Sequence, residues 1–355
     1  MADRDTTTGT HDDAIEPLAA LRRIAFLMER SRGEMRRVEA FRKAAATIVR
    51  LDPQELADRA AAGTLTELSA IGASTGRVIA QAIEGRRPDY LLDLEAAGAA
   101  DPLVQGSEPL LTQLRGDLHS HSNWSDGGSP IEEMVATAME LGREYLALTD
   151  HSRSLRVANG LSEERLRKQL EVVAAVDAHV SGSGFRLLAG IEVDILADGS
   201  LDQEAELLER LDVVVASVHS KLRSPAATMT KRMLGAIQNP RTNVLGHCTG
   251  RLVEGGRGTR PPSQFDARAV FEACVEHDVA VEINSRPERC DPPDELIELA
   301  LEIGCLFSID TDSHAPGQLD FLAYGAARAQ RLGVPAERIV TTWECDRLLE
   351  WAARR

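Results

Sequence analysis

The sequence is poor in aromatic residues and has no long apolar runs. Only 4% of its 355 residues are Phe, Trp or Tyr, although 43% are apolar. No apolar run approaches the roughly 18 residues that a membrane-spanning helix needs. The first residues, MADRDTTTGTHDDA, lack the charged and then apolar pattern of a signal peptide. We therefore expect a cytoplasmic protein that has no membrane partner.

The sequence also has no CxxC motif. Its five cysteines are scattered, so the sequence indicates neither a zinc ribbon nor a disulfide framework. We expect free thiols at Cys248, Cys274, Cys290, Cys305 and Cys345.

The chain has no general excess of basic residues, because its net charge is −16. This charge excludes a uniformly basic nucleic-acid binder. Residues 15–100 are nearly balanced, however, and seven of their 13 Lys and Arg residues fall within RSRGEMRRVEAFRKAAATIVR, residues 30–50. Any surface that follows a phosphate backbone should lie there. A solvated helix face with pairs such as Glu39 and Lys43 explains the same charges equally well.

Composition and periodicity divide the chain into four parts. Residues 1–14 are polar and expected to be disordered. In residues 15–100 the apolar positions recur at helical spacing, which indicates several short helices. Residues 101–113 contain Gly and Pro and are typical of a linker. Residues 114–355 form the second domain.

The stretch LTELSAIGASTGRVIAQAIEG resembles a helix-hairpin-helix with a tight turn at Ile71 and Gly72. In such a motif the backbone amides at the start of the second helix can hold a DNA phosphate without reading the base sequence. We therefore expect DNA as a partner of the helical domain. Its predicted DNA contacts are Arg36, Arg37, Arg42 and Gly72.

After residue 113 short apolar segments alternate with helical patterns, which favours a parallel sheet closed into an α/β barrel. Seven strands are expected, at 117–120, 145–149, 185–191, 213–218, 243–246, 279–283 and 305–309.

Six of the nine histidines follow these strands directly. A single histidine at such a place is more often a satisfied hydrogen-bonding residue than a ligand. Six histidines with interleaved carboxylates favour a metal site, because the carboxyl ends of parallel barrel strands share one face. Imidazole and carboxylate ligands without thiolate suit Zn, Mn or Fe. The residues at the strand ends are His119, His121, Asp150, His151, Glu192, Asp194, His219, His247, Asp312 and His314.

The motifs HSH with SDG, LTDH, GIEVD, SVHSK, GHCTGR and IDTDSHA together resemble the PHP (polymerase and histidinol phosphatase) domain. The chain is especially similar to the PHP domain that ends bacterial family-X DNA polymerases, over residues 115–350. This resemblance implies a distorted seven-stranded (β/α)7 barrel with three divalent metal ions, Mn or Zn, with Fe as an alternative.

The resemblance also implies the ligands. The first metal would be held by His119, His121, Glu192 and Asp312; Glu192 would bridge to a second metal at His219 and His247; Asp126, His151 and His314 would hold the third. Glu192, Asp312 and His121 are expected to be catalytic as well. Asp117 and Asp150 are expected to orient neighbouring imidazoles.

In the helical part, MRRVEAFRKAAATIV resembles the start of the polymerase's small helix-hairpin-helix domain. The turn, however, reads Ser-Ala-Ile-Gly where that family prefers Pro-Gly-Ile-Gly, so Ala70 is expected to strain or reshape it. Val78 stands where lyase-competent relatives carry a Schiff-base lysine, and no polymerase palm lies between the two domains. We expect neither polymerase nor lyase activity.

These features predict a metal-dependent hydrolase that acts on phosphate esters. The leading hypothesis is a DNA 3′–5′ exonuclease or 3′-end processing phosphodiesterase in DNA repair. The alternative is a small-molecule phosphomonoesterase of the histidinol-phosphatase type, which the acidic barrel favours. A DNA-binding adaptor with structural metals would be expected to lack some ligands, and none is lacking. The residues expected to hold the substrate phosphate are Arg153, Lys221, Arg251 and Arg286.

Overall fold

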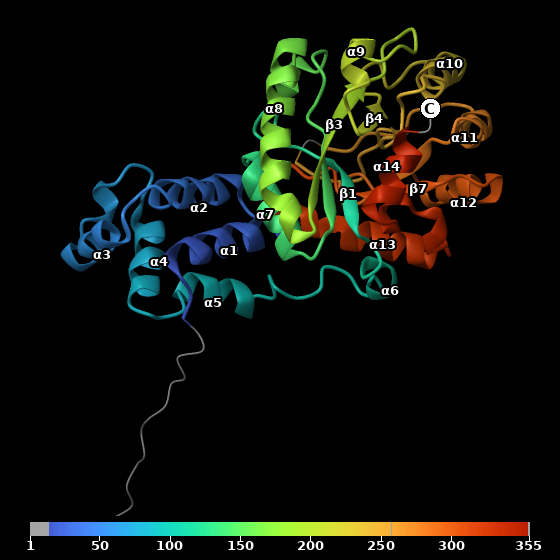
Figure 1. Ribbon diagram of the computed structural model, residues 1–355. Helices are drawn as coiled ribbons and strands as arrows, with labels where there is room; N and C mark the ends of the chain where they lie inside the picture. Colours follow the sequence, from blue (N-terminus) through green and yellow to red (C-terminus); the bar gives the residue numbers. More distant parts are fainter. Residues whose placement is uncertain (1–13, 257, 354–355) are drawn as a thin grey trace, which may run out of the picture. The chain divides into compact units, whose positions relative to one another are not determined.

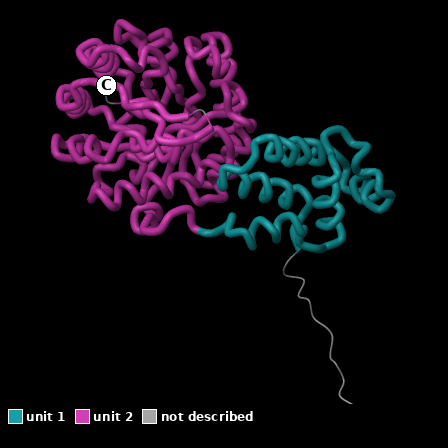
Figure 2. The backbone as a smooth tube through the Cα atoms, turned by 180° about the vertical axis from the view of Figure 1, so that it is seen from behind, with its two compact units in different colours: residues 1–101 teal, residues 102–355 magenta. Residues whose placement is uncertain are grey.

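The computed structural model describes residues 14–256 and 258–353. Residues 1–13, the main part of the expected disordered tail, lie outside the described residues. The chain divides into two compact units, residues 1–101 and 102–355 (Figure 2). No helix in the described ranges is both long enough and apolar enough to cross a membrane.

The first unit is entirely helical. Its α-helices are α1 (Pro17–Arg30), α2 (Met35–Ile48), α3 (Pro53–Ala62), α4 (Ala73–Ile83) and α5 (Asp89–Ala96), and a 3-10 helix, η2 (Leu65–Glu67), precedes α4. The apolar stripes of these helices meet in one core that includes Leu21, Ile24, Phe41 and Ile79.

The turn that was compared with a helix-hairpin-helix lies between η2 and α4. Ala70 has a φ of 65°, in the left-handed region that costs a non-glycine residue about 1–2 kcal/mol. Gly72 caps α4, and its N–H donates to the Thr75 hydroxyl at 2.9 Å. The Gly72 amide, predicted as a DNA contact, is therefore already bonded within the chain. The next amides, at Ala73 and Ser74, belong to a first helical turn, whose N–H groups have no partner within the helix.

The second unit is a nearly closed parallel barrel, so the prediction of its fold class is confirmed. The strands are paired in chain order. They are β1 (Gly116–Ser120), β2 (Tyr145–Leu148), β3 (Arg186–Asp194), β4 (Val213–Ser217), β5 (Val244–Leu245), β6 (Ala280–Asn284) and β7 (Phe307–Asp310).

Helices surround these strands (Figure 1). They are α6 (Glu108–Leu111), α7 (Ile131–Glu140), α8 (Glu163–Val180), α9 (Ala205–Leu208), α10 (Ala226–Ile237), α11 (Ala267–Glu276), α12 (Asp294–Ile303), α13 (Leu322–Arg331) and α14 (Cys345–Ala353). The segment expected to be a linker contributes α6 and the buried Leu110 to the core of this unit, and α6 packs on α13.

The barrel interior is apolar at one end and polar at the other. Val213 and Val215 of β4 pack with Trp351 of α14, which closes the apolar end. Along β6 the same face then carries Glu282 and Asn284, both fully buried. The carboxyl ends of the strands therefore form a buried polar site.

The first and last strands meet at a seam. The His121 N–H donates to the Ser313 carbonyl at 2.8 Å, and Ser120 and Ser313 form a parallel bridge. The Thr311 hydroxyl donates to the Asp117 carboxylate. The loops after β1 and β7 are thereby held side by side.

Candidate metal centre

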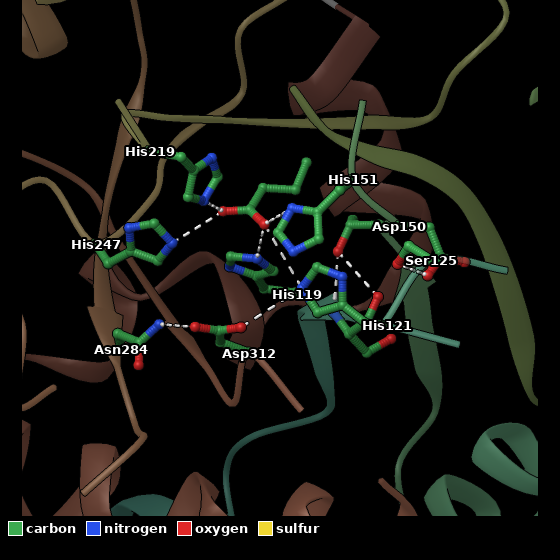
Figure 3. A network of polar contacts seen from close by, with 12 residues as sticks. His119, His121, Ser125, Asp150, His151, His219, His247, Asn284 and Asp312 are labelled. Atoms are coloured by element: carbon green, nitrogen blue, oxygen red, sulfur yellow. Dashed lines mark hydrogen bonds and ion pairs between the residues drawn. The ribbon is translucent and has the colours of Figure 1, made fainter. Parts of the chain in front are cut away.

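The structure brings all nine predicted metal ligands together at the carboxyl ends of the barrel strands. Figure 3 labels six of them, which are His119, His121, His151, His219, His247 and Asp312. They form overlapping groups in which the candidate ligand atoms lie within 4.8 Å of one another. The groups are His121, Asp126, His151 and His314; His119, His121 and Asp312; His119, Glu192 and His247; and His151, Glu192 and His219.

Most of these residues lie in the loops that directly follow the strands, as the sequence predicted. His119 and Glu192 are different, because β1 contains His119 and β3 continues to Asp194 and so contains Glu192. Strand β3 is longer than expected because it changes partners: Arg186–Ala189 pair with β2, and Gly190–Asp194 pair with β4.

The Glu192 carboxylate lies among five imidazoles. Its Oε1 is 2.9 Å from His247 Nε2 and 3.1 Å from His219 Nε2. Its Oε2 is 2.8 Å from His151 Nδ1, 3.3 Å from His119 Nε2 and 3.6 Å from His121 Nε2. This placement, with rings at both oxygens, suits a carboxylate that would help to hold more than one metal ion.

The group formed by Asp126, His151 and His314 is the most accessible. Asp126 Oδ1 lies 3.5 Å from His151 Nε2 and 3.4 Å from His314 Nε2. The side chains of Asp126 and His314 are 35% and 22% exposed, whereas those of His119 and His121 are fully buried. A substrate would therefore enter past Asp126 and His314.

Two buried carboxylates fix the imidazole orientations. Glu282 Oε1 lies 2.6 Å from His119 Nδ1, and Asp194 Oδ1 lies 3.0 Å from His219 Nδ1. Each contact occupies one ring nitrogen and directs the other toward Glu192. Such supporting carboxylates are typical of histidine ligands. Glu282 was missed in the sequence, where its signal is a charged residue inside the apolar strand AVEIN.

The expectation for Asp117 and Asp150 requires a correction. Asp117 accepts from the His119 main-chain N–H and from the Thr311 hydroxyl, not from an imidazole. Asp150 accepts from the hydroxyls of Ser122 and Ser125 (Figure 3). Both carboxylates hold the backbone of the ligand loops, because their short side chains reach main-chain and hydroxyl donors.

The charges of the cluster shift its pKa values in opposite directions. Burial raises the pKa of Glu192, but the imidazoles of His219 and His119 outweigh burial and hold this pKa well below its ordinary value. Burial lowers the pKa of His219, but Glu192 and Asp194 outweigh it and raise this pKa to about 9. Burial, together with His314 and His151, lowers the pKa of His121. In the metal-free protein, the His219 ring is therefore protonated more readily than the His121 ring.

Several buried polar atoms of the cluster have no hydrogen-bond partner among the described residues. They are His119 Nε2, His121 Nδ1 and Nε2, His151 Nδ1, Glu192 Oε2, His219 Nε2 and His247 Nδ1. Buried polar atoms are rarely left in this state. Ring nitrogens and carboxylate oxygens are ligands that Zn, Mn and Fe accept. The residues present therefore fit divalent ions.

Of the four predicted phosphate contacts, only Arg286 is seen to contact the candidate ligands. Its Nη1 lies 3.1 Å from the Asp312 carbonyl and 3.0 Å from His314 Nδ1. Arg289, which the sequence analysis missed, also reaches the cluster, since its Nε lies 2.9 Å from Asp312 Oδ2. Its position three residues after Arg286, in the loop that follows β6, is the signal that could have revealed it.

The other three predicted phosphate contacts differ from one another. The Arg251 guanidinium donates to the Cys290 carbonyl and so holds a loop, and its contact with phosphate stays a prediction. Arg153 pairs with Glu163 on the surface. Lys221 is exposed, with a φ of 53°.

The predicted DNA contacts also separate. Arg36 and Arg37 are exposed on α2. Arg42 instead forms a two-point ion pair with Glu29, with Nε–Oε1 and Nη2–Oε2 distances of 2.9 and 2.6 Å. The side chains of Arg42 and Glu29 are 11% and 1% exposed. Arg42 is therefore part of a structural ion pair, and its contact with DNA stays a prediction.

Comparisons with known proteins agree with the motifs. Residues 117–286 match the model of the PHP domain. The DNA polymerase/3′-5′ exonuclease PolX of Bacillus subtilis is 38% identical over 221 residues, which are 62% of this chain and 38% of that protein. A probable phosphatase of Vibrio campbellii is 27% identical over 244 residues, 64% of this chain and 89% of that protein.

A solved structure also matches, the histidinol phosphate phosphatase of Lactococcus lactis in complex with Zn, L-histidinol and phosphate. Its TM-score is 0.47 at 18% identity, and the match covers 62% of this chain and 94% of that one. The present chain spans 38% of the length of the Bacillus polymerase. The resemblance inferred from the motifs is confirmed: residues 117–286 of this chain form a PHP domain.

Proposed function

We propose that this chain is a metal-dependent phosphodiesterase that acts at the 3′ ends of DNA, as a 3′–5′ exonuclease or 3′-end processing enzyme in repair. The observation that carries the hydrolytic part is the Glu192 carboxylate, which lies among five imidazoles. In this proposal the nine clustered residues hold three ions, Mn or Zn.

When bound, such ions activate water at neutral pH and stabilise the charge of the attacking and leaving oxygens. The chain's own residues position the groups of the site and bind the phosphate. Glu192 sets the spacing of the groups on either side of it. Arg286 stands beside Asp312 and His314, where its guanidinium can bind a phosphoryl oxygen.

Two observations support DNA as the substrate. The first is the similarity to the Bacillus protein, whose name includes a 3′-5′ exonuclease. The second is the helical unit, which carries Arg36 and Arg37 on an exposed face and an exposed start of α4 at Gly72 to Ser74. We propose that this unit is a helix-hairpin-helix domain that binds the phosphate backbone. A cytoplasmic location belongs to the proposal, and the five free cysteines fit a reducing compartment.

The second candidate is a small-molecule phosphomonoesterase of the histidinol-phosphatase type. The acidic barrel favours it, because residues 101–355 hold 26 Lys and Arg against 40 Asp and Glu. The match to a probable phosphatase along 89% of that protein points the same way.

One experiment separates the candidates. The metal-loaded protein is incubated with 3′-labelled single strands, primed duplexes and a panel of phosphomonoesters that includes histidinol phosphate. We expect release of the 3′ label from the DNA, which a chelator and the His119→Ala substitution abolish. Rapid monoester turnover with intact DNA would overturn the proposal and favour the phosphatase.

The helical unit is tested with the double variant Arg36→Ala and Arg37→Ala. Each phosphate contact contributes a slope of about −0.9 to the dependence of log K on log salt, so the variant should bind DNA more weakly and with a flatter slope. Arg167→Ala with Arg268→Ala, exposed on α8 and α11, removes the same charge as a control. Equal effects of the two double variants would place DNA elsewhere.

A further inference from the structure

A cavity of about 520 Å³ lies in the barrel unit between the loop after β6, helix α13 and the segment that precedes α6. Pockets for small ligands commonly measure about 300–1,000 Å³. The residues that matter here are Asn284, Arg286, Tyr324, Ala327, Arg328 and Arg331, all in its wall. None of them except Asn284 and Arg286 contacts the metal cluster.

The cavity borders the metal cluster, because those two wall residues contact it. Asn284 Nδ2 lies 3.3 Å from Asp312 Oδ2 (Figure 3). Arg286 Nη1 contacts the Asp312 carbonyl and His314 Nδ1. A ligand in the cavity would therefore lie next to a phosphate held at Asp312 and His314.

The charge of the wall is unusual for this chain. Its described residues include three arginines and no Asp or Glu, although the whole chain has a net charge of −16. Arg328 and Arg331 share a single carboxylate, that of Asp294, at 2.9 and 2.6 Å. Arg286 lies 3.7 Å from Glu288 and 3.9 Å from Asp312, so the excess of positive charge is on the side of Arg328 and Arg331. This side of the wall suits an anionic ligand.

The wall also offers an aromatic ring. Tyr324 is half-buried on α13, and a tyrosine face can stack on any nucleobase. Gln330, which is exposed in the wall, adds an amide group that can both donate and accept. Positive charge, a ring and an amide within the volume of one small ligand are the features that recognise a nucleotide.

We propose that this cavity binds the 3′-terminal nucleotide of the DNA strand. This is the nucleotide that the enzyme releases when it cleaves the last phosphodiester bond. The assignment rests on the proposed phosphodiesterase activity and extends it, because it names the residues that would hold the departing unit. It also explains how an acidic barrel accepts a nucleic-acid end.

Ala327→Phe tests the cavity, because Ala327 is half-buried in its wall and Phe would fill it. The metal-loaded full chain is assayed with the p-nitrophenyl ester of thymidine 5′-phosphate and with methyl p-nitrophenyl phosphate, which has no nucleoside. We expect KM for the thymidine ester to rise about tenfold, the scale of a lost base stack. The kcat/KM for the methyl ester should not change.

Binding of thymidine 5′-monophosphate, measured by calorimetry, gives a readout that does not require turnover. Its affinity should fall about tenfold in Ala327→Phe and several-fold in Tyr324→Leu, which keeps an apolar side chain but removes the ring. The affinity for deoxyribose 5-phosphate should survive Tyr324→Leu. Ala175→Phe, on the exposed face of α8, is the control with the same chemical change.

The outcomes are distinguishable. If the folded Ala327→Phe and Tyr324→Leu variants bind thymidine 5′-monophosphate within about twofold of the parent protein, the cavity assignment is overturned. If the metal-loaded parent protein hydrolyses neither ester nor DNA, the proposed function fails, and nucleotide binding still decides whether the cavity recognises this ligand.

Discussion

Arg289 Nε lies 2.9 Å from Asp312 Oδ2, while the other oxygen of the same carboxylate faces His121 Nε2 at 3.4 Å. Burial raises the pKa of Asp312, but Arg289 and the contact with His121 outweigh burial and hold this pKa well below its ordinary value. Arg289 is thus a buried cation beside the carboxylates of the cluster, and it leaves one Asp312 oxygen directed at the ligand histidines.

Replacing Arg289 by Ala should therefore destabilise the metal-free protein, by about 3 kcal/mol, the cost of leaving a buried charge unpaired. Divalent metal should restore part of this loss, because it supplies positive charge to Asp312. Urea unfolding with chelator and with Mn measures both states. Arg268→Ala, exposed on α11, should cost less than about 0.5 kcal/mol. An identical loss with and without metal would show that Arg289 contributes packing alone.

Glu282→Gln should weaken metal binding without removing a predicted ligand. The Glu282 carboxylate contacts His119 Nδ1 and accepts from the His247 main-chain N–H at 2.5 Å. Loss of a carboxylate that supports a ligand histidine commonly costs about 10–100-fold in affinity. Competition with a chromophoric chelator measures the change. Glu298→Gln, exposed on α12, is the control, and equal affinities of the two variants would refute the supporting role.

Metal affinity should rise with pH. Burial lowers the pKa of His119, but Glu192 and Glu282 outweigh it and raise this pKa well above its ordinary value, while that of His219 reaches about 9. At neutral pH both rings are in the imidazolium form in the metal-free protein. The nitrogen that binds a metal ion must first lose its proton. The affinity should increase up to about pH 9. Calorimetry in buffers of different ionisation enthalpy should show proton release on binding, and its absence at pH 7 would contradict the expected protonation.

Arg42→Ala and Arg36→Ala should affect the helical unit differently, although both arginines lie on α2. Arg42 is paired with the buried Glu29, so its loss should cost about 3 kcal/mol of unfolding free energy. Arg36 is exposed, so its loss should cost under about 0.5 kcal/mol. Chemical unfolding followed by helix content measures both. A stable Arg42→Ala variant with weakened DNA binding would place Arg42 on the DNA surface instead.

The sequence predicted the barrel because its strands are short apolar segments between helical patterns. The strands lie in the barrel in the order in which they occur in the chain. It predicted the cluster because His119, His121, His151, His219, His247, Asp312 and His314 lie in or just after those segments. The end of β3 was misplaced because Glu192 and Asp194 look like loop residues, whereas they pair with Val215 and Ser217 of β4. Polarity alone cannot show that a carboxylate belongs inside a strand.

The second layer of contacts was less predictable. Arg42 and Arg36 look alike in the sequence, and only the position of Glu29 on α1 separates a buried pair from an exposed charge. Arg251 and Arg289 likewise follow different strands, and their partners are set by how the loops fold over the barrel end. Such pairings depend on tertiary geometry that local spacing does not encode.

The seam between β1 and β7 has a consequence for the order of assembly. His119 and His121 belong to the opening strand of the barrel and its loop, whereas Asp312 and His314 follow the closing strand, almost two hundred positions later. A ribosome-bound chain that has not yet released residues 307–314 cannot complete the shared cluster of these four side chains. Binding of an ion by His119, His121 and Asp312 should therefore occur only after the first and last strands have met.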